Sequence, residues 1–295
     1  MRISGFENLK TTSEELVVLM KTQAELIGNH PAAPNKFGEW LTSEDIAVTN
    51  KKRHRALTPL IATNDAELIN WLAEKIIHHH YDDFRLNKLK QKFGSLGFKK
   101  YAETHRKLPI TDKTKKGNAT EIILSEYIES SIGQNMVKAF KLKYNPNVDQ
   151  AIKGDDTLLI DISDENEPKV FLGEAKFRKT PAKAVVKDIL EALGKDKRPL
   201  SLTYIVDMLA RNPADIPLAD KIDELIIDDI KGRGGLIYTG MLLSNEDTKD
   251  VVELHLDSDN PTFIMISIGI ENPEELINAA FAKAEDDLAN NVMKL

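Results

Sequence analysis

Acidic and basic side chains that could act together on a bound ion gather between residues 145 and 178. Asp155 and Asp156 precede one apolar run, and Glu174 and Lys176 lie inside the next. Two carboxylates can hold a hard divalent cation such as Mg²⁺, which prefers oxygen ligands and keeps several of its waters. A lysine beside them can orient an attacking hydroxide or stabilise charge on a phosphate. These residues therefore predict a Mg²⁺ site, with Mn²⁺ as the alternative ion.

The two apolar runs, 157–162 and 170–177, are predicted to be the strands of one β-hairpin, because a polar, acidic turn separates them. Side chains alternate along a strand, so Glu174 and Lys176 share one face, roughly 7 Å apart. The hairpin would bring one of the two aspartates opposite them, and the register leaves open which one. The alternative is a salt bridge between Glu174 and Lys176 on an exposed face, although two charges inside an apolar strand are costly to bury without a partner.

This pattern resembles the PD-(D/E)xK nuclease superfamily, whose signature is an acid followed on the next strand by (D/E)-x-K. The matching residues are Asp156, with Asp155 beside it, and Glu174-Ala175-Lys176. The proline that precedes the first acid in the superfamily is missing, since Gly154 and Asp155 stand there. The resemblance implies a metal-dependent deoxyribonuclease. Its catalytic residues would be Asp156, Glu174 and Lys176, and both aspartates and Glu174 would be metal ligands.

A helix that is predicted to begin at residues 118–121 leads into this hairpin, with a strand at 136–144 between them. In the superfamily the leading helix often supplies another acid to the metal. The resemblance therefore makes Glu121 a further candidate ligand, ahead of Glu126. The alternative is that Asn118 and Glu121 form a capping box, because they have its three-residue spacing.

The composition sets wider bounds on the molecule. The chain has 295 residues, of which 41% are hydrophobic, enough for one large domain or two modest ones. It has no cysteine, which excludes disulfides, thiolate zinc sites and cysteine nucleophiles. The N-terminus lacks the apolar stretch of a signal peptide, and no run approaches about 18 apolar residues, so we expect a cytoplasmic protein without a membrane span.

Charge is distributed unevenly along the chain, whose formal net charge is −7. Residues 85–116 carry eleven lysines and arginines against two acids, whereas the part beyond Ala214 is strongly acidic. A basic face of this kind attracts phosphates, and the alternative is an ordinary solvated helix surface. The candidate nucleic-acid contacts are Lys99, Lys100, Lys115, Lys116 and Arg178.

The remaining pattern predicts an α/β fold with helices packed on a mixed central sheet. Residues 1–110 read as a helical, partly basic N-terminal region, and residues 111–295 as a nuclease-like domain. The polar, lysine-rich stretch 108–117 is the predicted boundary between them. Beyond the hairpin, helices are predicted at 181–193, 201–210, 218–230 and 272–281, and strands at 236–243 and 262–270.

Three local predictions concern shorter segments. Residues 42–45 are expected to open a short helix, and 251–257 to form a strand. The helix that starts at Asn64 ends in His78, His79 and His80. Consecutive helical side chains point about 100° apart, so these histidines cannot all bind one ion, and we expect an exposed helix end.

A closer resemblance is to the HamA-like nuclease family of the Hachiman antiphage defence system. The stretches KGNATEIILSEYI, KGDDTLLI and FLGEAKFR in the C-terminal half carry it. It implies an antiphage effector that degrades DNA together with a helicase partner. No nucleotide-loop motif of an ATP motor occurs in this chain, which is consistent with a separate motor subunit. The alternatives are a non-catalytic DNA-binding or regulatory subunit on the same fold and a restriction-type endonuclease.

Overall fold

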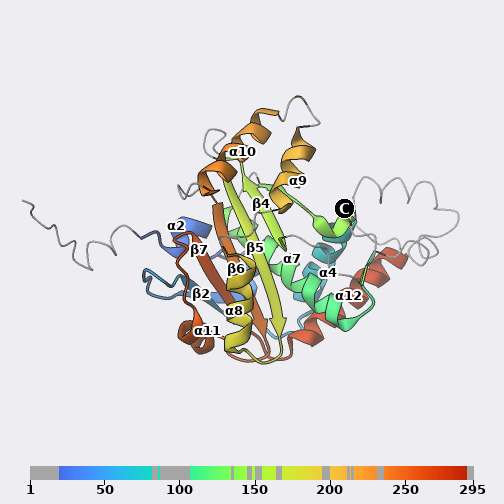
Figure 1. Cartoon of the computed structure of the whole chain (residues 1–295). Coiled ribbons are helices and arrows are strands. Elements are labelled where there is room, and N and C mark those ends of the chain that lie inside the picture. The colour runs from blue at the N-terminus through green and yellow to red at the C-terminus, as the bar shows by residue number, and fades with distance from the viewer. Residues whose placement is uncertain are drawn as a thin grey trace, which may run out of the picture.

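The structure is a computed structural model that describes residues 20–81, 86, 107–133, 136–144, 148–149, 155–163, 168–194, 200–210, 213, 216–230 and 236–290. One seven-stranded sheet runs through these residues in the order β1-β2-β7-β6-β5-β4-β3. Helices cover both of its faces (Figure 1), which confirms the predicted α/β fold with a mixed sheet. Within the same ranges, no helix is both long and apolar enough to cross a membrane.

The middle of the sheet consists of three parallel strands, β5 (Lys169–Arg178), β6 (Leu236–Ser244) and β7 (Phe263–Gly269). Every residue of β6 is buried. A strand that is covered on both faces reads as a continuous apolar run rather than an alternating one. The sequence therefore predicted the positions of β6 and β7 closely.

The predicted hairpin is present. β4 (Thr157–Asp161) pairs antiparallel with β5, and Thr157 lies opposite Gly173. β3 (Met136–Lys138) pairs antiparallel with the other edge of β4. β3 is shorter than the predicted strand at 136–144, because the chain turns into the 3₁₀ helix η1 (Lys141–Tyr144).

The N-terminal part of the chain adds two strands that the sequence did not predict, β1 (Leu41–Asp45) and β2 (His54–Pro59). The helix expected at 42–45 is wrong, since these residues pair antiparallel with β2. Thr42 and Ser43 resemble a helix start, but pairing in a sheet overrides such a local preference. β2 pairs parallel with β7, so the described N-terminal segments share one sheet with the C-terminal half. The division at residue 110 remains a prediction.

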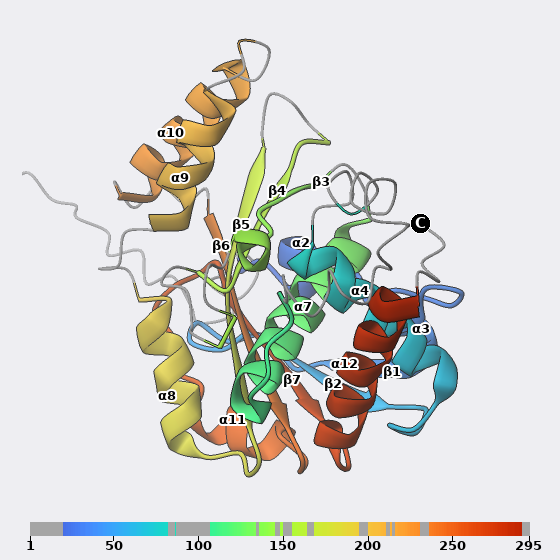
Figure 2. The same ribbon diagram turned by 90° about the vertical axis from the view of Figure 1, so that its right-hand side faces the viewer.

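The helices form two layers (Figure 2). On one face lie α4 (Ala66–His80), α7 (Asp112–Ile132) and α12 (Pro273–Asn290), and their apolar side chains share a core with Phe171. The short helices α2 (Gln23–Ile27) and α3 (Lys36–Trp40) add Ile27 and Trp40 to that core.

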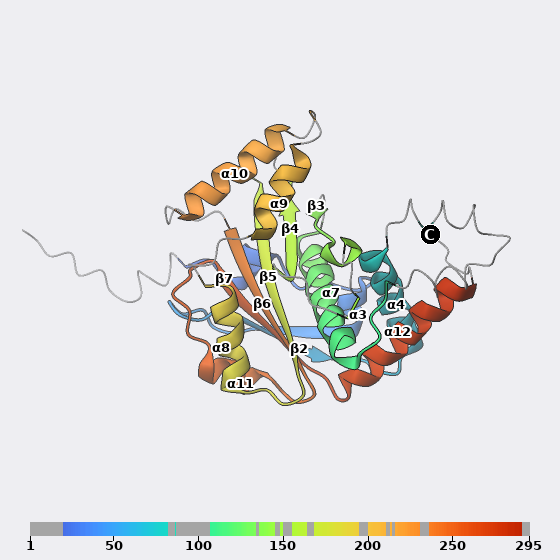
Figure 3. The same cartoon turned by 45° about the vertical axis from the view of Figure 1, so that its right-hand side comes forward.

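The opposite face is covered by α8 (Lys183–Ala192) and α11 (Lys249–His255). The strand expected at 251–257 is wrong, because Val252 and Leu256 lie four residues apart and both pack into this core. α9 (Leu200–Leu209) and α10 (Ile216–Ile230) pair with each other at the top of the view in Figure 3.

Helix α7 begins six residues before the predicted start. Thr111 is its N-cap and accepts a hydrogen bond from the backbone N–H of Thr114, so most of the expected boundary stretch is helical. Gly133 ends the helix with a φ of 98°, a left-handed conformation that favours glycine. Asn118 lies inside the helix, where its buried side chain is 3.0 Å from His80 Nε2. The capping-box alternative for Glu121 is therefore wrong.

Candidate active site

Asp156 lies at an open edge of the sheet. β5 continues to Arg178, whereas its pairing with β4 ends where Thr157 lies opposite Gly173. Asp156 sits just beyond that end and donates its backbone N–H to the carbonyl of Gly173 at 2.9 Å. Its Oδ2 accepts a hydrogen bond from the backbone N–H of Ala175 at 3.0 Å. The carboxylate of Asp156 therefore occupies the place that a longer β4 would have filled.

Glu174 and Lys176 follow on β5, and their side chains form an ion pair. The Glu174 side chain is only 13% exposed and that of Lys176 is 28% exposed. The salt bridge considered from the sequence therefore exists, but it is largely buried. Burial and the nearby charge of Asp156 raise the pKa of Glu174, although Lys176 acts in the opposite direction.

Glu121 reaches this edge from α7, because the helix lies close to β5. A Cβ atom at Gly173 would come within 2.8 Å of both Leu124 Cδ2 on α7 and Thr157 Cβ. Glycine is thus required for this approach. The hydroxyl of Thr157 also lies 3.5 Å from the backbone carbonyl of Glu121. The α7–β5 contact therefore places Glu121 near Asp156.

Lys141, from η1, joins the two carboxylates. Its Nζ is 2.7 Å from Asp156 Oδ1 and 3.2 Å from Glu121 Oε2. Glu121 Oε2 is buried and makes this ion pair but no hydrogen bond. Burial, followed by the charge of Asp156, raises the pKa of Glu121 to about 8. Sequence reasoning missed Lys141, since nothing distinguishes it from the neighbouring lysines 138 and 143.

The cluster is spread across the sheet edge. By strand alternation Glu174 and Lys176 point to the face of Leu172, which packs with α8. Glu121 approaches from the α7 face, and Asp156 lies between, with its charge affecting the pKa of both glutamates. Among the described residues no group of three or more acids or histidines is close enough to hold a metal ion alone.

These residues nevertheless fit Mg²⁺, which is commonly held by one or two carboxylates, with waters and phosphates as its other ligands. The raised pKa values of Glu121 and Glu174 reflect excess negative charge in a poorly solvated place. Glu121 Oε2, which is buried without a hydrogen bond, is an oxygen that a cation would satisfy. A further cation would also relieve the excess negative charge.

Other candidate residues are placed as follows. Asp155 is half-buried next to Asp156, but the contacts with Lys141 and Ala175 belong to Asp156. Lys116 lies 5.3 Å from the ring centroid of Phe177 and 3.7 Å from Glu274.

The remaining basic candidates are more scattered. Lys115 lies 5.9 Å from the ring centroid of Phe281 on α12. Arg178, at the end of β5, is 3.4 Å from Asp188, and both side chains are about half exposed. Lys99 and Lys100 lie outside the described residues.

Glu126 belongs to a different cluster on α7. It is 2% exposed and lies 2.8 Å from His79, 2.9 Å from Lys75 and 3.3 Å from Lys138. These partners hold the pKa of Glu126 below its usual range, although burial opposes them.

The prediction that the histidines of α4 form an exposed helix end is wrong. His79 and His80 are buried against α7, where they contact Glu126 and Asn118.

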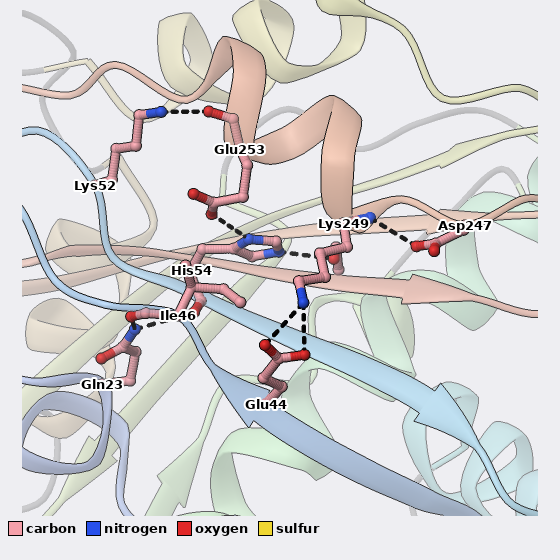
Figure 4. A network of polar contacts seen from close by, with 9 residues as sticks. Gln23, Glu44, Ile46, Lys52, His54, Asp247, Lys249 and Glu253 are labelled. Atoms are coloured by element: carbon pink, nitrogen blue, oxygen red, sulfur yellow. Dashed lines mark hydrogen bonds and ion pairs between the residues drawn. The ribbon is translucent and has the colours of Figure 1, made fainter.

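A second polar network lies under α11 (Figure 4). His54 Nδ1 is 2.6 Å from Glu253 and its Nε2 is 2.8 Å from Ser267 Oγ. The order Ser–His–Glu is that of a hydrolytic triad, but Ser267 is fully buried and no substrate can reach it. Lys249 pairs with Glu44 on β1 beside it, so this network connects the first strands to α11.

Comparison with known proteins identifies the family of this chain. The HamA family model matches residues 35–284, which include the described strands and every described residue of the cluster. The Hachiman protein HamA of Bacillus cereus is 37% identical over 284 residues, which cover 91% of this chain and 97% of that protein. The match spans the N-terminal segments as well as the hairpin. Because both matches cover most of the chain, this protein belongs to the HamA family.

Proposed function

We propose that this protein is a Mg²⁺-dependent deoxyribonuclease of the PD-(D/E)xK type. The observation that supports this most is the placement of Asp156, Glu174 and Lys176 together at an open sheet edge. Two largely buried acids and a lysine can supply what metal-dependent phosphodiester hydrolysis uses, namely ligands for a cation and a positive charge for the phosphate. Mn²⁺ would serve as the alternative ion.

Each side chain has a proposed role. Asp156 and Glu174 would be the main ligands, with Glu121 and Asp155 as supporting acids. When bound, the ion would neutralise phosphate charge and lower the pKa of a water. Lys176 would orient that water or stabilise the developing charge, and its ion pair with Glu174 keeps its ammonium beside the ligands.

DNA would approach along the end of β5. Lys116 lies over Phe177, the residue after Lys176, and Arg178 is half exposed one position further. With Lys115 they offer phosphates a local positive surface on a chain whose net charge is −7. Phosphate contacts of this kind position DNA without reading its sequence.

The family supports a role in antiphage defence. The relative from Bacillus cereus carries the name Hachiman, and we propose that this chain acts in the same kind of system, in the cytoplasm. The sequence contains no nucleotide-loop motif, so a helicase or other ATPase subunit would supply strand separation. The nuclease would then degrade the DNA that its partner opens.

The test compares wild type with Glu174→Ala and Lys176→Ala on plasmid and linear DNA with Mg²⁺, alone and with a co-purified helicase. Lys169→Ala, an exposed position on the same strand, is the matched control. We expect wild type and control to degrade DNA. Lys176→Ala should lose cleavage by about 10²-fold or more, as for removal of a charge-stabilising group, while it still binds DNA. Cleavage by Lys176→Ala at the wild-type rate would refute the assignment.

A second candidate function is a non-catalytic DNA-binding subunit. It is favoured by the ion pairs that lysines make with all three acids, Glu121, Asp156 and Glu174. Acids neutralised in this way could persist for structural reasons alone. If the protein is such a subunit, wild type in the same assay should bind DNA but not cleave it with any divalent metal ion, with or without the partner.

A further inference from the structure

Lys141 lies where it can hold the acids of the proposed metal site together when no metal ion is bound. This inference rests on the proposed function. Lys141 reaches from η1 to two acids that come from different elements, Glu121 of α7 and Asp156 before β4. All three side chains are largely buried, with 18%, 16% and 13% of their surfaces exposed. Carboxyl groups this poorly solvated need positive charge nearby when they ionise, and the ammonium provides it.

The oxygens of Asp156 show what a metal ion would meet. Oδ2 accepts the backbone N–H of Ala175, so Oδ1 is the oxygen that faces a cation, and Lys141 Nζ already lies 2.7 Å from it. Mg²⁺ binds carboxylate oxygens at about 2.0–2.1 Å and keeps a shell of waters. An ammonium and a divalent ion cannot share that oxygen closely, because both the space and the like charges oppose it.

We propose that Lys141 is a displaceable internal cation, which holds Glu121 and Asp156 together in the metal-free protein and leaves Asp156 Oδ1 when a divalent ion binds. The movement needs only rotation of a flexible four-carbon side chain. Backbone hydrogen bonds from Lys141 to Ala139 and from Lys143 to Phe140 keep the turn itself in place. Lys141 therefore weakens metal binding and keeps the empty site folded.

Lys138 provides a matched control. It also pairs with two acids, Glu126 and Glu129, and its side chain is 14% exposed, close to the value for Lys141. Those acids belong to the other cluster on α7. Lys138→Met therefore removes the same charge and the same kind of ion pair without touching Asp156.

The first test measures binding of Mg²⁺ and Mn²⁺ by calorimetry without DNA, in wild type, Lys141→Met and Lys138→Met. We expect Lys141→Met to bind about tenfold more tightly, the effect of losing one competing charge interaction, and Lys138→Met to match wild type. Equal or weaker binding by Lys141→Met would overturn the inference, because Lys141 would then position the ligands rather than compete.

The outcomes also separate this inference from the proposed function. If wild type binds metal and cleaves DNA but Lys141→Met binds no more tightly, only the inference fails. If neither chain binds an ion and wild type does not cleave, both fail. Binding by Lys141→Met alone would support the inference strongly.

Because Lys141→Met leaves two buried acids without a counter-ion, a second test uses the wild-type chain. Lysines are acetylated briefly with and without Mg²⁺, and the modified positions are measured by mass spectrometry. Released from the acids, Lys141 should be modified several-fold faster with Mg²⁺, while Lys138 should not change. Equal rates at Lys141 would contradict its displacement.

Discussion

Glu121 is the residue whose protonation depends most on its surroundings in the candidate site. Its pKa is raised to about 8 by burial and by Asp156, against an ordinary value of 4.5. Glu126, five residues later on the same helix, is paired with Lys75, Lys138 and His79 and has a lowered pKa. The same residue type on one helix is therefore driven in opposite directions by its neighbours.

This contrast predicts a pH dependence of stability. Between pH 4.5 and about 8 the unfolded chain loses a proton that folded Glu121 retains, so stability from this group is full at low pH and falls as pH rises. Glu121→Gln removes that loss. In metal-free buffer with EDTA, its melting temperature relative to wild type should increase from pH 5 to pH 8.5.

Glu126→Gln is the control for this prediction. It removes the carboxylate that Lys75, Lys138 and His79 share, and Lys138 keeps only Glu129, so it should destabilise the protein at neutral pH. Thermal unfolding of both variants beside wild type checks the pair. A melting difference for Glu121→Gln that is constant with pH would contradict the raised pKa. The lowered pKa of His80, about 4, is common to all three proteins and cancels in the comparison.

At the scale of elements, the site depends on how closely α7 lies against β5. Gly173 makes that approach possible on one face of the sheet. On the other face, Gly240 of β6 allows α8 to pack equally closely, since a Cβ there would come within 2.6 Å of Ile189 Cγ2. The two glycines are alike in steric terms, but only the first supports the helix that carries Glu121.

The predicted consequence concerns alanine at each position. Both Gly173→Ala and Gly240→Ala should destabilise the fold, by about 1–3 kcal/mol as for overpacked cores. Gly173→Ala should in addition weaken Mg²⁺ binding and cleavage, because α7 must move away from Asp156. Urea unfolding and metal titration measured on both variants would separate the effects. If the two alanines reduce metal binding equally, α7 does not set the site.

At the scale of the whole molecule, one sheet unites the described N-terminal segments with the rest. β2 pairs with β7, α4 packs against α12, and Lys249 pairs with Glu44. Phe37 and Trp40 lie in the same core as residues of β5 and α7. A division at residue 110 would cut through this core.

We therefore expect the fragment 111–295 not to fold alone. It would expose the edge of β7 and the apolar faces of α7 and α12, and unpaired strand edges promote aggregation. Circular dichroism and thermal unfolding of the fragment beside the full chain check this. A fragment that unfolds cooperatively near the temperature of the full chain would establish the two-domain division instead.

The sequence alone determined the elements whose signals are local. The apolar runs and the polar turn predicted the hairpin, and with it the proximity of one of the two aspartates to Glu174 and Lys176. The register of the strands shows that Asp156 is the one. Strands β6 and β7 could also be located, because doubly buried strands are continuously apolar. The helices α8 and α10 followed from their apolar spacing.

Tertiary structure decided what depends on partners far away in the chain. β1 is a strand because β2 is beside it, and α11 is a helix because its apolar side chains fit the core. Asn118 is a packing residue inside α7, so Glu121 has no capping role, and the close contact of α7 with β5 places Glu121 near Asp156. Lys141 meets two acids only after α7, η1 and β4 are assembled, since ion pairs between distant segments leave no periodic signal in the sequence.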